Sequence, residues 1–341
     1  MTKKKYIEQG FGEVKSKRVY MTFTFFFTTY FFCFTKRYPT SKMTICSPYI
    51  YSWCLKNDKK YKISSLRDVK EKTCFDYVIL AFLTNETYDE IEQWIPEITQ
   101  FPGNVILSIG GADGHYPSVK LNVAEEFKKL DTLIAAAGFK GLDLDIEGKA
   151  LNDQYRLSKL LEIVKMISIK YGPNFWISIT LPVEYEIGIG DDAAKVLKLF
   201  NNAKIHIKYI NLMIMDFYTD LGHYRTWEEH NFKIIHKSNA ILQKIFGKTK
   251  RDVWKMMGLC PMIGQNDDGI IFTLEDWRHM VSFAFQMKIG LLTFWALNRD
   301  QIIHKKPHLF AKFRTDLNLY SYAQTSDFAF TGEITRKLTG P

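Results

Sequence analysis

The sequence lacks the patterns that mark several large classes of protein. No cysteine lies in a CxxC pair and no histidines show metal-binding spacing, so no metal site is indicated. No GxGxxG or Walker loop follows the first predicted strand, which argues against a nucleotide-binding sheet and leaves no cofactor to expect. The odd number of cysteines does not demand a disulfide framework, although Cys46 and Cys54 would be able to pair in an exported protein.

A strongly basic working domain is also absent. The net charge of +9 suggests an anionic partner, but residues 1–42 alone carry +7 and residues 43–341 only +2. The body of the chain is therefore nearly neutral, and we expect no nucleic-acid partner.

The basic N-terminal segment contains an uncharged run of sixteen residues, Val19 to Phe34, seven of which are Phe. As a helix this run would rise about 24 Å, somewhat short of a hydrocarbon core of about 30 Å. Basic residues before an apolar run are typical of a secretory signal, but no Ala-x-Ala-like site follows. We predict a leader at 1–42, either a signal or an anchor at 19–34, with an N-terminal extension as the alternative, and a secreted, monomeric domain at 43–341.

From residue 43 the chain alternates short apolar runs with helical stretches. Eight runs read as buried parallel strands. They are 44–53, 75–83, 104–109, 141–146, 175–181, 207–217, 254–263 and 289–296. Helical stretches are expected at 124–137, 154–170, 193–202, 239–246 and 274–287. Eight strands with helical connections over about 300 residues favour a single (β/α)8 barrel over a doubly wound open sheet.

Three acids in the fourth run carry most of the functional information. Asp143, Asp145 and Glu147 alternate with Leu142, Leu144 and Ile146. Because alternate residues of a strand share a face, the three carboxyl groups point together, about 6–7 Å apart along the strand. Buried like charges raise each other's pKa, and Glu147, outermost at the working end of the barrel, is the expected proton donor.

Alternating acids on a strand have two other common explanations in proteins. An acidic face in contact with water is the ordinary explanation of alternating acids, but no face of a strand in a closed parallel barrel is solvated. A metal cluster is the second, because hard cations bind grouped carboxylates, yet no histidine or further acid completes a set of ligands. Catalysis is favoured.

These segments resemble glycoside hydrolase family 18, the chitinases and related endo-β-N-acetylglucosaminidases, across about 43–304. The acids resemble the family's DxxDxDxE motif. Four further elements follow in the family's order: Ser108-Ile109-Gly110-Gly111, Met213-Ile214-Met215-Asp216, 261–267 with Gln265, and 290–300 with Trp295.

The resemblance implies a (β/α)8 barrel and hydrolysis of β-1,4 bonds beside N-acetylglucosamine in chitin. Because few residues separate Ile263 from Ile289, we expect the family's extra α+β insertion to be absent. It implies Glu147 as acid and base, Asp145 as the group that orients the acetamido group, and Asp143 as its proton-sharing neighbour. Asp216 would hydrogen-bond near the acetamido group and Trp295 would stack on the sugar. Gln265 would either reach substrate or tie down a loop.

Two positions depart from the family pattern. Lys140 stands where the family has its first Asp, and Met215 where a Tyr is frequent, so Tyr218 is the candidate hydroxyl partner for the acetamido group. These departures keep a non-catalytic chitin-binding lectin as one alternative. An endo-β-N-acetylglucosaminidase acting on N-glycans is another. Tyr51, Trp53 and Phe82 are candidate aromatic residues of the cleft, but barrel packing is their favoured use.

Overall fold

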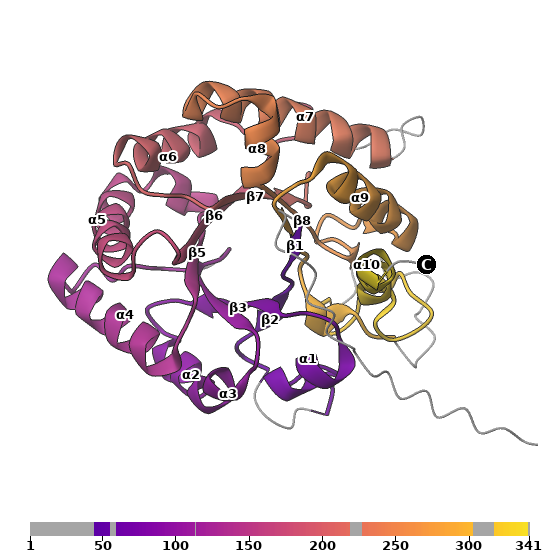
Figure 1. Cartoon of the computed structure of the whole chain (residues 1–341), viewed down its shortest axis with the longest axis horizontal. Coiled ribbons are helices and arrows are strands. Elements are labelled where there is room, and N and C mark those ends of the chain that lie inside the picture. Colours follow the sequence, from indigo (N-terminus) through magenta and orange to yellow (C-terminus); the bar gives the residue numbers. More distant parts are fainter. Residues whose placement is uncertain (1–43, 55–58, 113, 219–226, 303–316, 340–341) are drawn as a thin grey trace, which may run out of the picture. The chain divides into compact units, whose positions relative to one another are not determined.

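The computed structural model describes residues 44–54, 59–112, 114–218, 227–302 and 317–339. The expectations for the leader at 1–42, for its boundary with the domain and for Cys33 lie outside these ranges. Within them, parallel strands form a ring that is covered on its outside by helices (Figure 1). The predicted single (β/α)8 barrel is confirmed.

The barrel strands follow one another around the ring in chain order. They are β1 (Ile45–Cys46), β2 (Tyr49–Tyr51), β3 (Tyr77–Leu83), β4 (Asn104–Gly110), β5 (Gly141–Asp145), β6 (Trp176–Pro182), β7 (Tyr209–Ile214), β8 (Met257–Pro261) and β11 (Leu291–Leu292). β1 pairs with β11 and β2 pairs with β3, so these two short segments are the halves of one strand. That shared strand closes an eight-stranded barrel, and nearly every strand residue is buried because helices cover the outside.

The helices lie between the strands along the chain. They are α1 (Leu66–Lys72), α2 (Tyr88–Glu92), α3 (Ile95–Gln100), α4 (Val123–Ala137), α5 (Gln154–Tyr171), α6 (Asp191–Asn202), α7 (Trp227–Phe246), α8 (Lys250–Met256), α9 (Leu274–Met287) and α10 (Ala329–Thr339), with 3-10 turns η1 (Gly148–Asn152) and η2 (Leu297–Arg299). Local sequence sets several ends. Asn122 and Glu125 form a capping box at the start of α4, and Gly138 ends it with φ of 73°.

Several predicted boundaries differ from the structure, among them those of three segments. Residues 254–256, expected to open a strand, complete α8, whose N-cap Thr249 accepts from the Asp252 amide. The helix expected at 239–246 begins at Trp227. Of the run at 289–296, Leu291 and Leu292 form β11, and Trp295 makes an isolated parallel bridge with Met262. In each case the apolar residues are buried as expected, but burial alone does not distinguish a strand from the helix turn that precedes it.

The connection between β8 and β11 is short. It contains only the hairpin of β9 (Gly264–Gln265) with β10 (Ile271–Phe272), and helix α9. Residues 262–290 are all described, so no additional α+β domain stands on this side of the barrel.

The described residues also bear on the cysteine pairing and on membrane-spanning helices. Cys46 and Cys54 are not joined by a disulfide, so the candidate pairing of these two residues is not formed. Across the described ranges, no helix has the length and apolar character needed to cross a membrane.

Candidate active site

A cavity of about 510 Å³ opens where the barrel strands end. Five of the predicted site residues line it: Asp145, Glu147, Met215, Asp216 and Trp295. They come from the ends of β5, β7 and β11, which the closed sheet brings to one edge. We call this cavity the cleft.

Asp143 lies beneath the cleft, fully buried, and accepts four hydrogen bonds from hydroxyl groups. Its Oδ2 accepts from Tyr49 and Ser108 at 2.8 Å each. Its Oδ1 accepts from Ser178 at 2.6 Å and from Thr180 at 2.8 Å. Burial raises the pKa of Asp143, and the four hydroxyl donors oppose that rise.

Strand register explains how these donors reach one carboxyl group. In the sheet, Asp143 pairs with Ser108 of β4 and with Ser178 of β6, so all three side chains occupy the same layer of the barrel. Ser178 and Thr180 were not predicted as site residues. Their spacing of two in an otherwise apolar strand is the sequence signal that would have found them, because period-two polar residues in a buried strand face the barrel interior.

A second layer of polar groups holds Tyr49 in place. Asn211 donates from Nδ2 to the Tyr49 hydroxyl and to Thr180 Oγ1, both at 3.2 Å. Thr293 in turn donates to Asn211 Oδ1 at 3.2 Å. Strands distant in sequence therefore supply one connected network under the carboxyl groups, which fixes their positions.

Asp145 and Glu147 stand above Asp143 on the cleft wall. Asp145 is 6% exposed, and its Oδ1 is buried without a hydrogen-bond partner. Burial, together with the charges of Glu147 and Asp143, raises the pKa of Asp145 well above its usual range. Glu147, directly after β5, is partly exposed in the cleft. Asp145 therefore favours its protonated form, and Glu147 lies beside it at the edge of the cleft that water reaches.

Gly110 and Gly111 allow the end of β4 to approach the backbone of Asp145 closely. Gly110 has φ of 113°, and a Cβ at this position would lie 2.1 Å from the Asp145 carbonyl oxygen. The Gly111 amide donates to that same oxygen at 3.2 Å. The predicted structural role of these glycines is therefore explained by close approach of the backbone to Asp145.

Asp216 projects into the cleft from the end of β7. Its Oδ1 accepts from the Asp267 amide at 2.7 Å, and its own amide donates to Asn266 Oδ1 at 3.3 Å. Burial and the nearby charge of Asp267 raise the pKa of Asp216 to about 6, although the backbone donors work against that rise.

Aromatic rings form the floor and one wall of the cleft. Trp295 stacks on Phe82 with ring centroids 5.3 Å apart at 15°, and lies 5.7 Å from Tyr49. Trp53 stacks on Tyr51 at 4.4 Å and 11°, lines the cleft, and is 40% exposed. Trp53 and Phe82 thus line the cleft besides packing, whereas Tyr51 is fully buried as expected.

Two predicted binding residues lie away from the cleft wall. Tyr218 is 74% exposed and does not line the cleft; its amide donates to Asp268 Oδ2 at 3.2 Å. Gln265 is buried in β9, where its amide donates to Ser321 and its carbonyl accepts from Arg299. Local contacts in the loops after β7 and β8 set both positions, and spacing alone does not reveal them.

Lys140 is exposed just before β5, at the opposite end of the strand from Glu147. It lines a separate cavity there with Lys208 and Trp176. The groups that surround the Asp143 carboxyl are hydroxyls rather than this ammonium.

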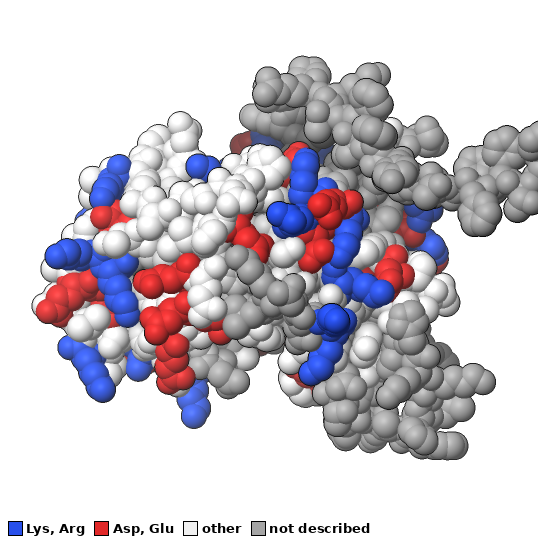
Figure 2. Space-filling model, turned by 90° about the horizontal axis from the view of Figure 1, so that it is seen from below, with Lys and Arg blue, Asp and Glu red and all other residues white. Residues whose placement is uncertain are grey.

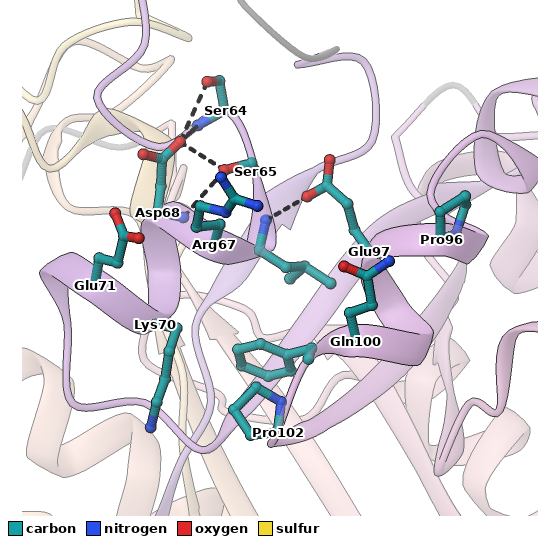
Figure 3. A pocket seen from close by; sticks show the side chains of 12 residues that line it. Ser64, Ser65, Arg67, Asp68, Lys70, Glu71, Pro96, Glu97, Gln100 and Pro102 are labelled. Atoms are coloured by element: carbon teal, nitrogen blue, oxygen red, sulfur yellow. Dashed lines mark hydrogen bonds between the residues drawn. The ribbon is translucent and has the colours of Figure 1, made fainter.

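A second cavity, of about 650 Å³, lies away from the carboxyl groups, against α1 and α3 (Figure 3). Its polar groups serve the helix ends: Asp68 accepts from the hydroxyls of Ser64 and Ser65, and Glu97 accepts from the Leu66 amide at 2.7 Å. None of the predicted site residues lines it. Nor do the described side chains gather three His, Cys, Asp or Glu groups that would hold a metal ion.

The chain is similar in sequence to a known protein family. Residues 33–257 match the model of glycosyl hydrolases family 18. The chain is 27% identical over 218 residues to a probable bifunctional chitinase/lysozyme of Escherichia coli (strain K12) and to endochitinase 11 of Metarhizium anisopliae. Each match covers 60% of this chain but only 24% and 42%, respectively, of the two relatives.

Solved structures extend the likeness over most of the chain. Active domain 2 of a thermostable chitinase from Pyrococcus furiosus, solved as catalytic-site mutants complexed with chito-oligosaccharides, has a TM-score of 0.72 at 25% identity. That likeness covers 88% of this chain and 96% of the other. Catalytic domain 2 of the Ostrinia furnacalis group II chitinase shares the fold, with a TM-score of 0.57 at 13% identity.

Proposed function

The chain belongs to glycosyl hydrolases family 18, and we propose that it hydrolyses β-1,4 bonds between N-acetylglucosamine units of chitin. The observation that carries the proposal is the arrangement of Asp143 and Asp145 on β5 and of Glu147 two residues beyond it, at a cleft floored by Trp295. The chito-oligosaccharides bound to the Pyrococcus furiosus domain support the same class of substrate.

In the proposed reaction the substrate supplies its own nucleophile. The 2-acetamido oxygen of the sugar attacks the anomeric carbon while Glu147 protonates the leaving oxygen, and Glu147 then accepts a proton from the attacking water. The net result is retention of configuration at the anomeric carbon. Glu147 suits this role because it stands at the cleft edge, where both sugar and water have access.

Asp145 and Asp143 would share a proton during these steps, which changes the charge of Asp145. The raised pKa of Asp145 favours a protonated carboxyl in the free enzyme, able to orient the acetamido group. As positive charge develops on the oxazolinium-like intermediate, sharing of this proton with Asp143 would leave Asp145 ionised to stabilise it. Asp216, across the cleft, would hydrogen-bond near the acetamido group, and Trp295 would stack against the apolar face of the ring.

The shape of the barrel end supports endo cleavage. The connection between β8 and β11 adds only the β9–β10 hairpin and α9, so it raises no additional wall beside the cleft. An open cleft would accept a chain along its length, with the bond to be cut in the interior.

The deciding experiment compares wild type with Glu147→Gln on a chromogenic chitooligosaccharide. Because general acid–base catalysis contributes about 10²–10⁴-fold, we expect kcat to fall by that factor. Glu162→Gln, which changes an exposed glutamate on α5, is the matched control and should retain full activity. Equal turnover by Glu147→Gln and wild type would refute the role of Glu147. Binding of chitin without cleavage by wild type would identify a lectin.

Product analysis separates the remaining alternatives. Chitohexaose should yield a mixture of chain lengths, whereas release of disaccharide alone would contradict endo cleavage. A high-mannose glycopeptide run beside chitin would reveal an N-glycan substrate.

We also propose that the protein is secreted, on the basis of the basic, Phe-rich leader at 1–42. Expression with and without this segment, followed by assay of the medium and the membrane fraction, tests the assignment. Equal export of both forms would contradict it.

A further inference from the structure

The titratable side chains that line the described cleft wall are predominantly acidic. Its described lining residues include six acids and no lysine, arginine or histidine. These acids are Glu86, Glu90, Asp145, Glu147, Asp216 and Asp267. The contrast with the rest of the molecule is clear, because residues 43–341 carry a net charge of only +2. On the face seen in Figure 2 basic and acidic side chains alternate.

Three of these acids have no part in the proposed reaction. Glu86 and Glu90 follow β3, and Asp267 follows β9 beside Asp216. In the closed ring of eight strands β3 and β7 stand four places apart, so Glu86 and Glu90 face the Asp216 and Asp267 side across the barrel end. A polysaccharide that crosses the cleft over Trp295 therefore passes carboxylates on both sides.

Among the described residues of the cleft wall, no cationic side chain lies beside Glu86, Glu90 or Asp267. Glu90 accepts from the neutral hydroxyl of Ser52. Arg299 interacts electrostatically with Asp216 and Asp267, but its side chain is fully buried and does not line the cleft. In addition, the buried Oδ1 of Asp145, on the cleft wall, lacks a hydrogen-bond partner. The wall thus offers hydrogen-bond acceptors and negative charge to a ligand that brings donors and positive charge.

We propose that the cleft prefers partly N-deacetylated chitin, whose free 2-amino groups are protonated, over the fully acetylated polymer. This inference rests on the proposed function and names its substrate class more closely. The sugar at the cleaved bond must keep its acetamido group, because that group is the nucleophile. Units on either side need not, and a glucosamine ammonium at those places would lie near Glu86 and Glu90, or near Asp267.

The test compares kcat/KM on chitohexaose with kcat/KM on partly deacetylated chitosan hexamers, for the full chain at mildly acidic pH. We expect a ratio in favour of the deacetylated substrate that falls towards one at about 1 M salt, where the Debye length is about 3 Å. In low salt the double variant Glu86→Gln/Glu90→Gln should lower this ratio by about threefold, as expected for exposed ion pairs. Glu162→Gln should leave the ratio unchanged.

A ratio at or below one, insensitive to salt, would overturn the inference while chitohexaose cleavage still upheld the proposed function. If neither substrate is cleaved, the proposed function fails, and binding decides the inference separately. Glu147→Gln protein should then bind the chitosan hexamers more tightly than chitohexaose, with the difference lost in high salt. Equal affinity in low salt would refute the preference.

Discussion

The Tyr49 hydroxyl donates a 2.8 Å hydrogen bond to Oδ2 of Asp143 and thereby joins β2 to β5 across the barrel interior. Both residues are buried, and 94 positions of sequence separate them. The same hydroxyl accepts from Asn211, so Tyr49 couples the carboxyl group at the base of the site to the polar network on β6, β7 and β11. The acid that carries no direct contact with the cleft is thus the one most firmly held.

Tyr49→Phe tests this coupling. Loss of the hydroxyl leaves Asp143 with one fewer donor, and we expect the free energy of unfolding to fall by about 1–3 kcal/mol. The remaining Asp143 carboxylate has a pKa raised further, so its ionised form costs more in the folded state. The loss of stability should therefore be larger at neutral pH than at about pH 4, where the group is nearer its protonated form. Urea unfolding at both values measures it, and an equal loss at both would contradict the assignment.

Asp216→Asn should make the protein more stable at neutral pH. The pKa of Asp216 is about 6 in the fold, above the ordinary value of about 3.9, so the folded state binds more protons between these values. Its contribution to stability is present at low pH and is lost as pH rises through about 6, by up to about 2–3 kcal/mol. The asparagine Oδ1 is still able to accept from the Asp267 amide. Unfolding curves should favour the variant at neutral pH and show no gain at about pH 4; a gain independent of pH would argue against the raised pKa.

Trp53→Ala should weaken binding of long substrates. Trp53 exposes 40% of its surface in the cleft and stacks on Tyr51, so its removal takes away a face for a sugar without emptying the core. We expect KM for chitohexaose to rise about fivefold with kcat nearly constant, and Trp53→Phe to restore most of the affinity. Tyr155→Ala, at an exposed aromatic position on α5, provides the control. A change confined to kcat would show that Trp53 acts on the reacting atoms instead.

Gly110→Ala should separate β4 from β5 at the site. A Cβ there would lie 2.1 Å from the Asp145 carbonyl oxygen, in a backbone conformation of φ 113° that side chains rarely adopt. We expect a loss of about 2–4 kcal/mol in unfolding free energy and a fall in kcat, because Asp145 must move. Gly332→Ala, in open space on α10, should be tolerated and serves as the control. Wild-type stability in Gly110→Ala would disprove the close approach.

Local sequence predicts the elements of this fold well. Helix α9 occupies exactly the expected residues 274–287, and all eight expected strands exist, because apolar runs and capping residues act over short distances. The period-two spacing of Asp143, Asp145 and Glu147 likewise placed these carboxyl groups on one face before any tertiary information. Boundaries such as that between α8 and β8 were missed because buried residues flank both sides.

The sequence predicts the residues that surround the site less well than it predicts the helices and strands. Tyr218 and Gln265, proposed as binding residues from the family resemblance, lie away from the cleft wall. Glu86 and Glu90, which were not proposed, line it, and so does Trp53, for which packing was the favoured use. Which side chains converge depends on how distant loops pack against one another after the barrel closes. Spacing along one strand contains no information on that packing.

The order of the eight strands along the chain and the common orientation of Asp143, Asp145 and Glu147, on and just after β5, were therefore determined by the sequence itself, through the periodicity of local burial. Only the tertiary structure decided the proton affinities of these acids, because Tyr49, Ser108, Ser178 and Thr180 come from other strands to surround Asp143. Desolvation and hydrogen bonding depend on every group that closes around a carboxyl, and those groups meet only in the closed barrel.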